Sequence, residues 1–436
     1  MSHPLSDPAL SAVAARMSGL EVPLPRRARI LEIGCCSGHN ILPLAERWPE
    51  GYFVGIDLAE SSIIKARELA AATGLENVTF HAGDLAKFSP QDGPFDFIIA
   101  HGFFSWVPDE VKAALLVFCH EHLSPSGVAM VSFNLECGWK ARLPTIQKAR
   151  AIQQARGGGA VEALEILSSL LEPDDPEISI IEDMLAKGEV ILAFDEFGPI
   201  NDPWSLDRFV SAAANVGLRW LGESDPNENI PRGLSREFVE ELKNESVDAL
   251  SFQNALDESV GQTFRSGLLC RADAPVSGGI SSRVALDFSV RASAEPDAPE
   301  AKVVYHAVRA FAPACVSVKE VIASLPGCDV RAVARLVLDG IHYDWLQPRI
   351  EPVKFAADAP EFPRLTPFLF QCARRGLPLM DAWHEACEFP EAHYELLAAM
   401  DGHLSYDQLA QIAQKKCPEL AFKPWLGHLA YRGMLL

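Results

Sequence analysis

The chain is short of basic residues for its size. Its 436 residues include 38 Lys and Arg against 59 Asp and Glu, so its formal net charge is −21 at pH 7. Because a nucleic-acid backbone is held by clustered Lys and Arg, this composition argues against nonspecific binding to DNA or RNA. An acidic surface instead attracts basic or cationic substrates.

Long apolar runs and paired cysteines are also missing. No apolar run reaches the roughly 20 residues that span a bilayer, and the start of the chain lacks the basic-then-apolar order of a secretion signal. The ten cysteines form no Cys-X-X-Cys pair and lie mostly in apolar segments, which is typical of reduced, buried thiols. We therefore expect a cytoplasmic protein without membrane insertion. The length of 436 residues predicts two or three domains.

The first part of the chain alternates between short apolar runs and segments with helical spacing. Ser61 and Ser62 are expected to cap the start of one helix, and Gly74 to end it. The alternation predicts an α/β fold, a doubly wound Rossmann-like parallel sheet that holds its ligand at the carboxyl ends of the strands. Strands are expected at residues 29–33, 51–57, 77–84, 94–102 and 126–134, and helices at 41–48, 61–74 and 111–123.

The loop in LEIGCCSGHN (31–40) does not have the spacing of a dinucleotide-binding loop. Such a loop needs Gly-X-Gly-X-X-Gly so that the backbone approaches a pyrophosphate, but the glycines here are Gly34 and Gly38. Glu32 is also unsuited to a pyrophosphate. Its carboxylate suits the ammonium and sulfonium of S-adenosylmethionine (SAM), either directly or by holding the loop or bound water.

Two further acids follow successive strands of the expected sheet. Asp57 ends the second strand, where a carboxylate can accept from both ribose hydroxyls, and Asp84 ends the third, where it can accept from the adenine amino group. The three acids together favour SAM as the cofactor. The alternative is a degenerate Rossmann-like domain that binds no ligand.

Several motifs resemble one bacterial family. IIAHGFFSWVPDEV (98–111), SFNLECGW (132–139) and the loop from Gly34 to Asn40 are similar to methyltransferases that carry a methyltransferase regulatory domain, a group that includes the rickettsial protein-lysine methyltransferases. Residues 194–223 and 264–271 resemble the regulatory domain, and 377–389 and 400–410 show weaker similarity. The resemblance implies a class I SAM-dependent methyltransferase with a seven-stranded sheet.

The chain departs from the family pattern near the expected acceptor site. Phe104 and Phe133 stand where the family usually has Tyr, and Cys137 replaces Pro. Both Phe residues lack a hydroxyl that the family has. The sequence leaves open whether these changes alter the acceptor or abolish activity.

Four segments are expected. Residues 1–137 form the SAM-binding core, 138–203 a helical insertion, 204–275 a regulatory region that completes the sheet, and 285–436 a mainly helical, winged-helix-like domain after a Pro/Gly/Ser linker. The insertion is interpreted as a lid over the strand ends, with a packing subdomain as the alternative. For the C-terminal domain, protein docking or dimerisation is favoured over DNA binding.

Candidate site residues follow from the motifs and the resemblance. His101 could contact the cofactor or accept a proton, Phe104 and Trp106 could hold a cationic amine by cation–π attraction, and Asn134 could orient it. His384, Glu385 and Cys387 lack a second spaced pair of ligands, so no metal site is expected and helix packing is favoured for them. Cofactor contacts are expected from Glu32, Gly34, Cys36, Gly38, Asn40, Asp57, Leu58, Gly83, Asp84, Leu85 and His101.

The function expected from the resemblance is N-methylation of protein lysine. No strong general base is evident in the sequence, so an amine acceptor fits better than an alcohol. The alternatives are a small-molecule methyltransferase, and a SAM-binding regulatory or scaffold protein without turnover. A dimer or a protein partner bound through the C-terminal domain is also expected.

Overall fold

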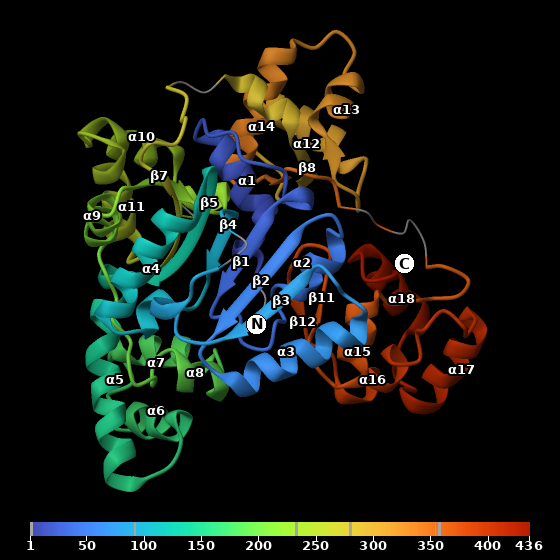
Figure 1. Cartoon of the computed structure of the whole chain (residues 1–436), viewed down its shortest axis with the longest axis horizontal. Coiled ribbons are helices and arrows are strands. Elements are labelled where there is room, and N and C mark those ends of the chain that lie inside the picture. Colours follow the sequence, from blue (N-terminus) through green and yellow to red (C-terminus); the bar gives the residue numbers. More distant parts are fainter. Residues whose placement is uncertain (1–2, 91–92, 232–233, 279–280, 354, 356–358) are drawn as a thin grey trace.

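A seven-stranded sheet forms the centre of the molecule (Figure 1). The computed structural model describes residues 3–90, 93–231, 234–278, 281–353, 355 and 359–436. Strand β7 is antiparallel to both of its neighbours, and the other strands run parallel. The sheet order is β3 (Val78–Ala82), β2 (Tyr52–Asp57), β1 (Arg29–Ile33), β4 (Phe95–Ala100), β5 (Leu123–Asn134), β7 (Phe264–Arg271) and β6 (Leu218–Glu223). The expected class I methyltransferase topology is confirmed.

Strand β1 shows how the sheet separates two hydrophobic cores. Ile30 faces a core that it shares with α1 (Pro8–Met17), α2 (Leu42–Arg47) and α3 (Glu60–Thr73). Leu31 and Ile33 face the other core, with α4 (Asp109–His122) and α9 (Leu206–Asn215). Each such side chain contributes about 1.5–3 kcal/mol on burial. A buried parallel strand is apolar on both faces for this reason.

Helix α3 begins differently from the prediction. Its N-cap residue is Ala59, which makes no side-chain cap, so the expected serine cap is wrong. The carboxylate of Asp57 accepts from the Ala59 backbone N–H at 2.8 Å instead. Gly74 ends the helix with φ of 72°, as expected, because glycine tolerates this left-handed conformation.

The insertion forms a helical unit with its own small core. It begins at the carboxyl edge of the sheet, directly after β5, and Figure 1 shows it extending away from the sheet. Its helices are α5 (Glu136–Arg156), α6 (Ala160–Ser169), α7 (Glu177–Leu185) and α8 (Glu189–Phe194). Two helices of the regulatory region, α10 (Arg236–Glu245) and α11 (Ala249–Val260), lie between β6 and β7 in the sequence.

The C-terminal part of the chain forms two units. The first, near α1 in Figure 1, has the strand order β10-β8-β9 with three helices, which suits the expected winged-helix-like arrangement. It contains β8 (Ser289–Ala292), α12 (Pro299–Arg309), β9 (Val316–Ser317), α13 (Val318–Ala323), α14 (Val330–His342) and β10 (Leu346–Arg349). The second unit lies beside α2 and α3. It contains α15 (Pro367–Arg374), β11 (Leu379–Met380), β12 (Ala386–Cys387), α16 (Glu391–Leu397), α17 (Tyr406–Lys416) and α18 (Phe422–Tyr431).

No helix among the described residues is both long enough and apolar enough to cross a membrane.

Candidate functional site

The loop between β1 and α2 depends on glycine at two positions. Gly34 has φ of 74° and Gly38 has φ of 79°, a region that other residues rarely adopt. A Cβ on Gly38 would also come within 3.0 Å of the Phe80 ring. Cys36 has φ of 49°. The loop is therefore held in a tight conformation at the carboxyl end of β1.

A cavity of about 290 Å³ lies against this loop. Five of the predicted cofactor residues line it: Glu32, Gly34, Cys36, Asn40 and His101. The rest of the wall comes from neighbouring loop residues and from the C-terminal unit that contains α15, β11 and β12. The structure thus brings the strand-end acid, the small-residue loop and the histidine after β4 together around one pocket.

Glu32 is buried in the wall of this cavity and only half satisfied. Its Oε1 accepts from the amide Nδ2 of Asn40 at 2.9 Å, whereas its Oε2 has no hydrogen-bond partner among the described residues. Burial raises the pKa of Glu32 to about 7, and the hydrogen bond from Asn40 opposes this rise. A buried carboxylate is costly unless it is paired. A cationic group in the cavity would supply the missing partner, so these residues fit the ammonium-bearing end of SAM.

The acids at the ends of β2 and β3 lie beside the cavity and outside its wall. The two oxygens of Asp57 accept from the backbone N–H groups of Cys36 and Ala59, each at 2.8 Å. Gly83 donates its N–H to the Asp57 backbone oxygen at 2.9 Å, which places the end of β3 next to that of β2. A carboxylate keeps further acceptor positions after two such bonds. Contacts of Asp57 and Asp84 to a ribose and an adenine stay predictions.

The other residues predicted along this edge differ in exposure. Leu58 is 77% exposed, which leaves an apolar side chain free to pack on a flat ring, and Leu85 is buried. Asp84 accepts from the Ala86 backbone N–H at 3.0 Å and begins a short 3-10 helix. Their contacts to a cofactor also stay predictions.

His101 is a poor proton acceptor in this structure. Its ring lies 5.0 Å from the His3 ring and 6.0 Å from the Phe264 ring, measured between centroids. Burial lowers the pKa of His101 to about 3, so the imidazole is neutral at physiological pH. Its Nε2 has no partner among the described residues. Of the two expected roles, contact with a bound molecule fits this setting, and that of general base does not.

Phe104 does not reach the cavity. It is fully buried, with ring centroids 4.9 Å from Trp204 and 5.5 Å from Phe209. Phe133, also fully buried, stacks on Phe209 at 4.2 Å. Both Phe residues are therefore packed in the core in this structure, where a Tyr hydroxyl would need a buried partner. A contact between Phe104 and an acceptor stays a prediction.

Asn134 connects the loop after β4, which also carries Trp106, to the end of the insertion. Trp106 is partly exposed, and its Nε1 has no described partner. The Nδ2 of Asn134 donates to the Oδ1 of Asn201 at 3.1 Å, and its backbone N–H donates to the Oγ of Ser105 at 2.8 Å. A direct role for either residue in orienting an acceptor stays a prediction.

The sequence reasoning missed the C-terminal wall of the cavity. Phe368, Leu377, Pro378, Met380 and Ala386 line it, whereas no residue of 138–200 does. The insertion does not line this cavity, and its role as a lid over the acceptor site stays a prediction. The family-like stretch at 377–389 was the available signal. His384, in that stretch, lies in the turn between β11 and β12, not in a packed helix as expected.

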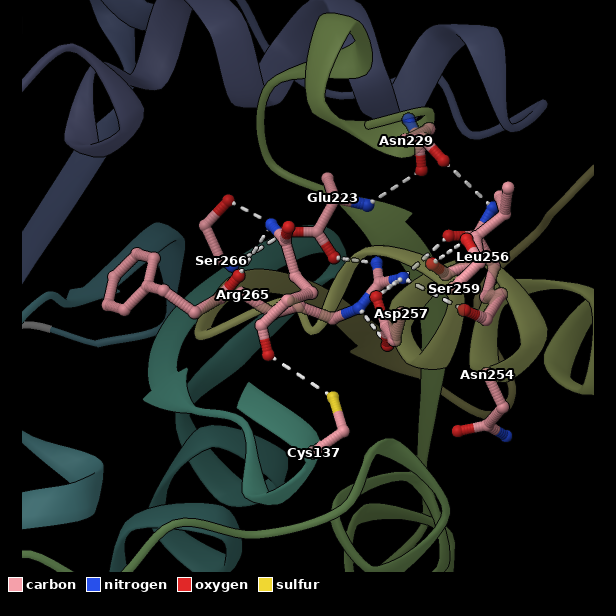
Figure 2. A network of polar contacts seen from close by, with 12 residues as sticks. Cys137, Glu223, Asn229, Asn254, Leu256, Asp257, Ser259, Arg265 and Ser266 are labelled. Atoms are coloured by element: carbon pink, nitrogen blue, oxygen red, sulfur yellow. Dashed lines mark hydrogen bonds and ion pairs between the residues drawn. The ribbon is translucent and has the colours of Figure 1, made fainter. Parts of the chain in front are cut away.

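A second polar network ties the regulatory region to the sheet, as Figure 2 shows. Arg265 donates to Glu223 at 2.6 Å and to both oxygens of Asp257, at 2.8 and 2.9 Å. The other oxygen of Glu223 accepts from the Ser266 backbone N–H at 2.6 Å. All three charged side chains are nearly buried. This network joins β6, β7 and α11, and its carboxylates have their partners within the protein.

Comparisons with known proteins agree with this arrangement. Residues 30–127 match the family model of a methyltransferase domain, and residues 188–271 that of a predicted methyltransferase regulatory domain. The structure of PKMT2 from Rickettsia typhi in complex with AdoHcy superposes with a TM-score of 0.85 at 18% identity, over 99% of this chain and 98% of that one.

Curated relatives match smaller parts of the chain. A Rickettsia prowazekii protein is 26% identical over 308 residues, 68% of this chain and 56% of the relative, so the chain spans little more than half of that protein. The trans-aconitate 2-methyltransferase of Variovorax paradoxus is 36% identical over 110 residues, 25% of this chain and 40% of that enzyme. The expected resemblance is confirmed: the chain has the class I SAM-dependent methyltransferase fold and combines a methyltransferase domain with a methyltransferase regulatory domain.

Proposed function

We propose that this protein is a SAM-dependent methyltransferase and that its acceptor is an amine, the side chain of a protein lysine. The observation that carries the cofactor assignment is the buried Glu32 carboxylate, which lines the cavity with one oxygen unpaired. SAM, when bound, would supply a methyl group that a neutral nucleophile attacks, and the neutral thioether S-adenosylhomocysteine would leave. The free carboxylate oxygen of Glu32 would then accept a hydrogen bond from the ammonium group of the cofactor.

The residues around the cavity favour an amine over an alcohol. An alcohol acceptor needs a base to remove its proton, and burial lowers the pKa of both histidines that line the cavity, His39 and His101, that of His101 to about 3. An amine that has already lost its proton to water attacks without such a base. The protein's contribution is then to hold the reactants in position and to keep water from them.

Protein lysine is supported by two further features. The family motifs and the fold shared with PKMT2 extend over nearly the whole chain, beyond the catalytic domain alone. The net charge of −21 would also attract a basic protein segment.

A small-molecule acceptor is the second candidate, because relatives that match the methyltransferase part include trans-aconitate 2-methyltransferases. Trans-aconitate carries carboxylates. A chain with a net charge of −21 repels such an acceptor, and a neutral His101 offers it no positive charge.

Tritiated SAM separates the candidates. Purified protein and an extract of host cells are incubated with it, and products are divided by size before counting. The proposal predicts label in the protein fraction that resists mild base, as an N-methyl group does and an ester does not. Label in the small-molecule fraction would replace protein lysine by a metabolite. SAM binding without label in any fraction would support a scaffold without turnover. The Glu32→Gln variant is the matched control and should lose the label.

A further inference from the structure

The cavity is closed by a part of the chain that is remote in sequence. Phe368 on α15 and Met380 on β11 line it opposite the loop that follows β1. The same unit is fastened to α2: the backbone N–H of Phe368 donates to Glu46 at 2.6 Å, and Arg47 donates to the carbonyl oxygen of Ala382 at 3.0 Å. The C-terminal unit is therefore a wall of the cofactor cavity and not an appended module.

A polar connection runs from this unit to the cofactor carboxylate. His384 is fully buried, and its Nε2 lies 2.7 Å from the Oδ1 of Asn40, although the two residues are 344 positions apart. Asn40 in turn donates from Nδ2 to Oε1 of Glu32 at 2.9 Å. The Oγ of Ser6 also lies 2.8 Å from the Oδ1 of Asn40. Asn40 therefore connects three parts of the chain: the N-terminal segment through Ser6, strand β1 through Glu32, and the C-terminal unit through His384.

The direction of these hydrogen bonds fixes the chemical state of His384. Because SAM binding needs the ionised Glu32 carboxylate, Asn40 must donate to it through its NH₂ group. The Asn40 carbonyl oxygen then faces His384, so Nε2 of the imidazole must carry the proton and donate. Burial lowers the pKa of His384 to about 3, which keeps the ring neutral. A neutral donor at this point orients the amide without placing a second positive charge near a cationic cofactor.

The turn that carries His384 is stabilised by hydrogen bonds to Asp381. His384 has φ of 66°, a left-handed conformation that is unfavourable for histidine. The carboxylate of Asp381 supports the turn by accepting from the backbone N–H groups of Trp383 and Glu385, each at 2.9 Å. Arg432 on the segment after α18 donates to the same carboxylate at 2.9 Å. The strained residue is therefore held by its surroundings.

We propose that His384 is a positioning residue for the cofactor: by donating to Asn40 it fixes the amide that orients Glu32, so that the C-terminal unit is a working part of the SAM site. The proposal rests on the proposed function, because it takes SAM as the occupant of the cavity. It predicts that cofactor affinity depends on a residue that does not itself line the cavity.

The test is calorimetric titration of S-adenosylhomocysteine into the full chain and its variants. His384→Ala should weaken binding by about tenfold, because the Asn40 carbonyl oxygen loses its buried donor. His384→Gln should restore binding to within about threefold, because the amide nitrogen of Gln can stand where Nε2 stands. Wild-type affinity in His384→Ala would overturn the proposal, as would failure of His384→Gln to restore binding.

Two controls separate positioning from general loosening of the C-terminal unit. Leu409→Ala removes a fully buried side chain of α17 that has no link to Asn40, so it should lower the melting temperature and leave the affinity within about twofold of wild type. In an Asn40→Ala background, His384→Ala should weaken binding no further. Equal weakening by Leu409→Ala, or a full additional loss in the double variant, would overturn the proposal.

Binding of S-adenosylhomocysteine by the wild-type protein tests the proposed function itself. If wild-type protein does not bind S-adenosylhomocysteine, the proposed function fails and the positioning role with it. If wild-type protein binds and His384→Ala binds equally well, only the positioning role fails.

Discussion

Two buried glutamates at the same edge of the sheet differ in how their oxygens are paired. Glu223, at the end of β6, is bonded through one oxygen to Arg265 and through the other to Ser266. Glu32, in β1, is bonded through one oxygen to Asn40, and the other has no described partner. A buried carboxylate whose partners lie in the protein fastens the fold, whereas one left unpaired beside a cavity is suited to a cationic ligand.

The largest effect is expected from breaking the fully paired network. Arg265→Met leaves Glu223 and Asp257 buried without their cation and should destabilise the protein by about 3–5 kcal/mol. Urea unfolding followed by circular dichroism measures this. Arg271→Met on the same strand removes an ion pair to the exposed Asp273 and should leave stability nearly unchanged. Similar midpoints for both variants would show that the network does not fasten the regulatory region.

The reverse pattern is expected for Glu32. Glu32→Gln should weaken SAM binding by about 1.5–3 kcal/mol, the value of a charge-assisted hydrogen bond, without lowering the stability of the ligand-free protein. Glu223→Gln should lower stability and leave the affinity of the folded protein for SAM near wild type. Calorimetry and thermal unfolding of both variants measure the two quantities. Loss of stability in Glu32→Gln without loss of affinity would contradict the distinction drawn between these residues.

Asp57 is predicted to combine both kinds of role. Its carboxylate holds two backbone N–H groups beside the cavity, and its contact to the ribose is a prediction. Asp57→Ala should weaken SAM binding by about 1–3 kcal/mol, the cost of unpairing polar groups. Glu60→Ala, an exposed acid at the start of α3, is the matched control and should bind as wild type. Unchanged affinity in Asp57→Ala would remove the ribose contact from the account.

The smallest effect is the contribution of Glu32 to the pH dependence of stability and of SAM binding. Burial raises the pKa of Glu32 from 4.5 to about 7, with Asn40 opposing and Asp57 adding to the shift. Between pH 4.5 and about 7, Glu32 keeps its proton in the folded ligand-free protein and has lost it in the unfolded chain. The contribution of Glu32 to the free energy of unfolding therefore falls as the pH rises through this range.

SAM binding needs the ionised carboxylate, so affinity should rise by up to about tenfold per pH unit below pH 7. Titration of S-adenosylhomocysteine from pH 5.5 to 7.5 measures this rise. Glu32→Gln should flatten it, and an unchanged slope in that variant would assign the dependence to another group.

Much of the sheet was predictable because its signals are local. The apolar runs at 29–33 and 94–102 and the glycine at position 74 lie within a few residues of the elements that they define. Glu32 and the loop glycines were also found locally, because a strand end and a following loop are adjacent in the chain.

The missed features depend on contacts between distant segments. The burial of Phe104 is decided by Trp204 and Phe209, which come from beyond the insertion. The wall formed by Phe368 and the hydrogen bond from His384 require the C-terminal unit to fold back onto α2. Neither the periodicity nor the spacing of residues in the sequence predicts that the C-terminal unit packs on α2.

A crystal structure of the protein with S-adenosylhomocysteine would show whether Glu32 binds the cofactor. We expect the ligand in the cavity between the β1 loop and the C-terminal unit, with its ammonium group within hydrogen-bond distance of Oε2 of Glu32. A ligand bound elsewhere, or one whose ammonium group is held by other residues while that oxygen stays unpaired, would contradict it.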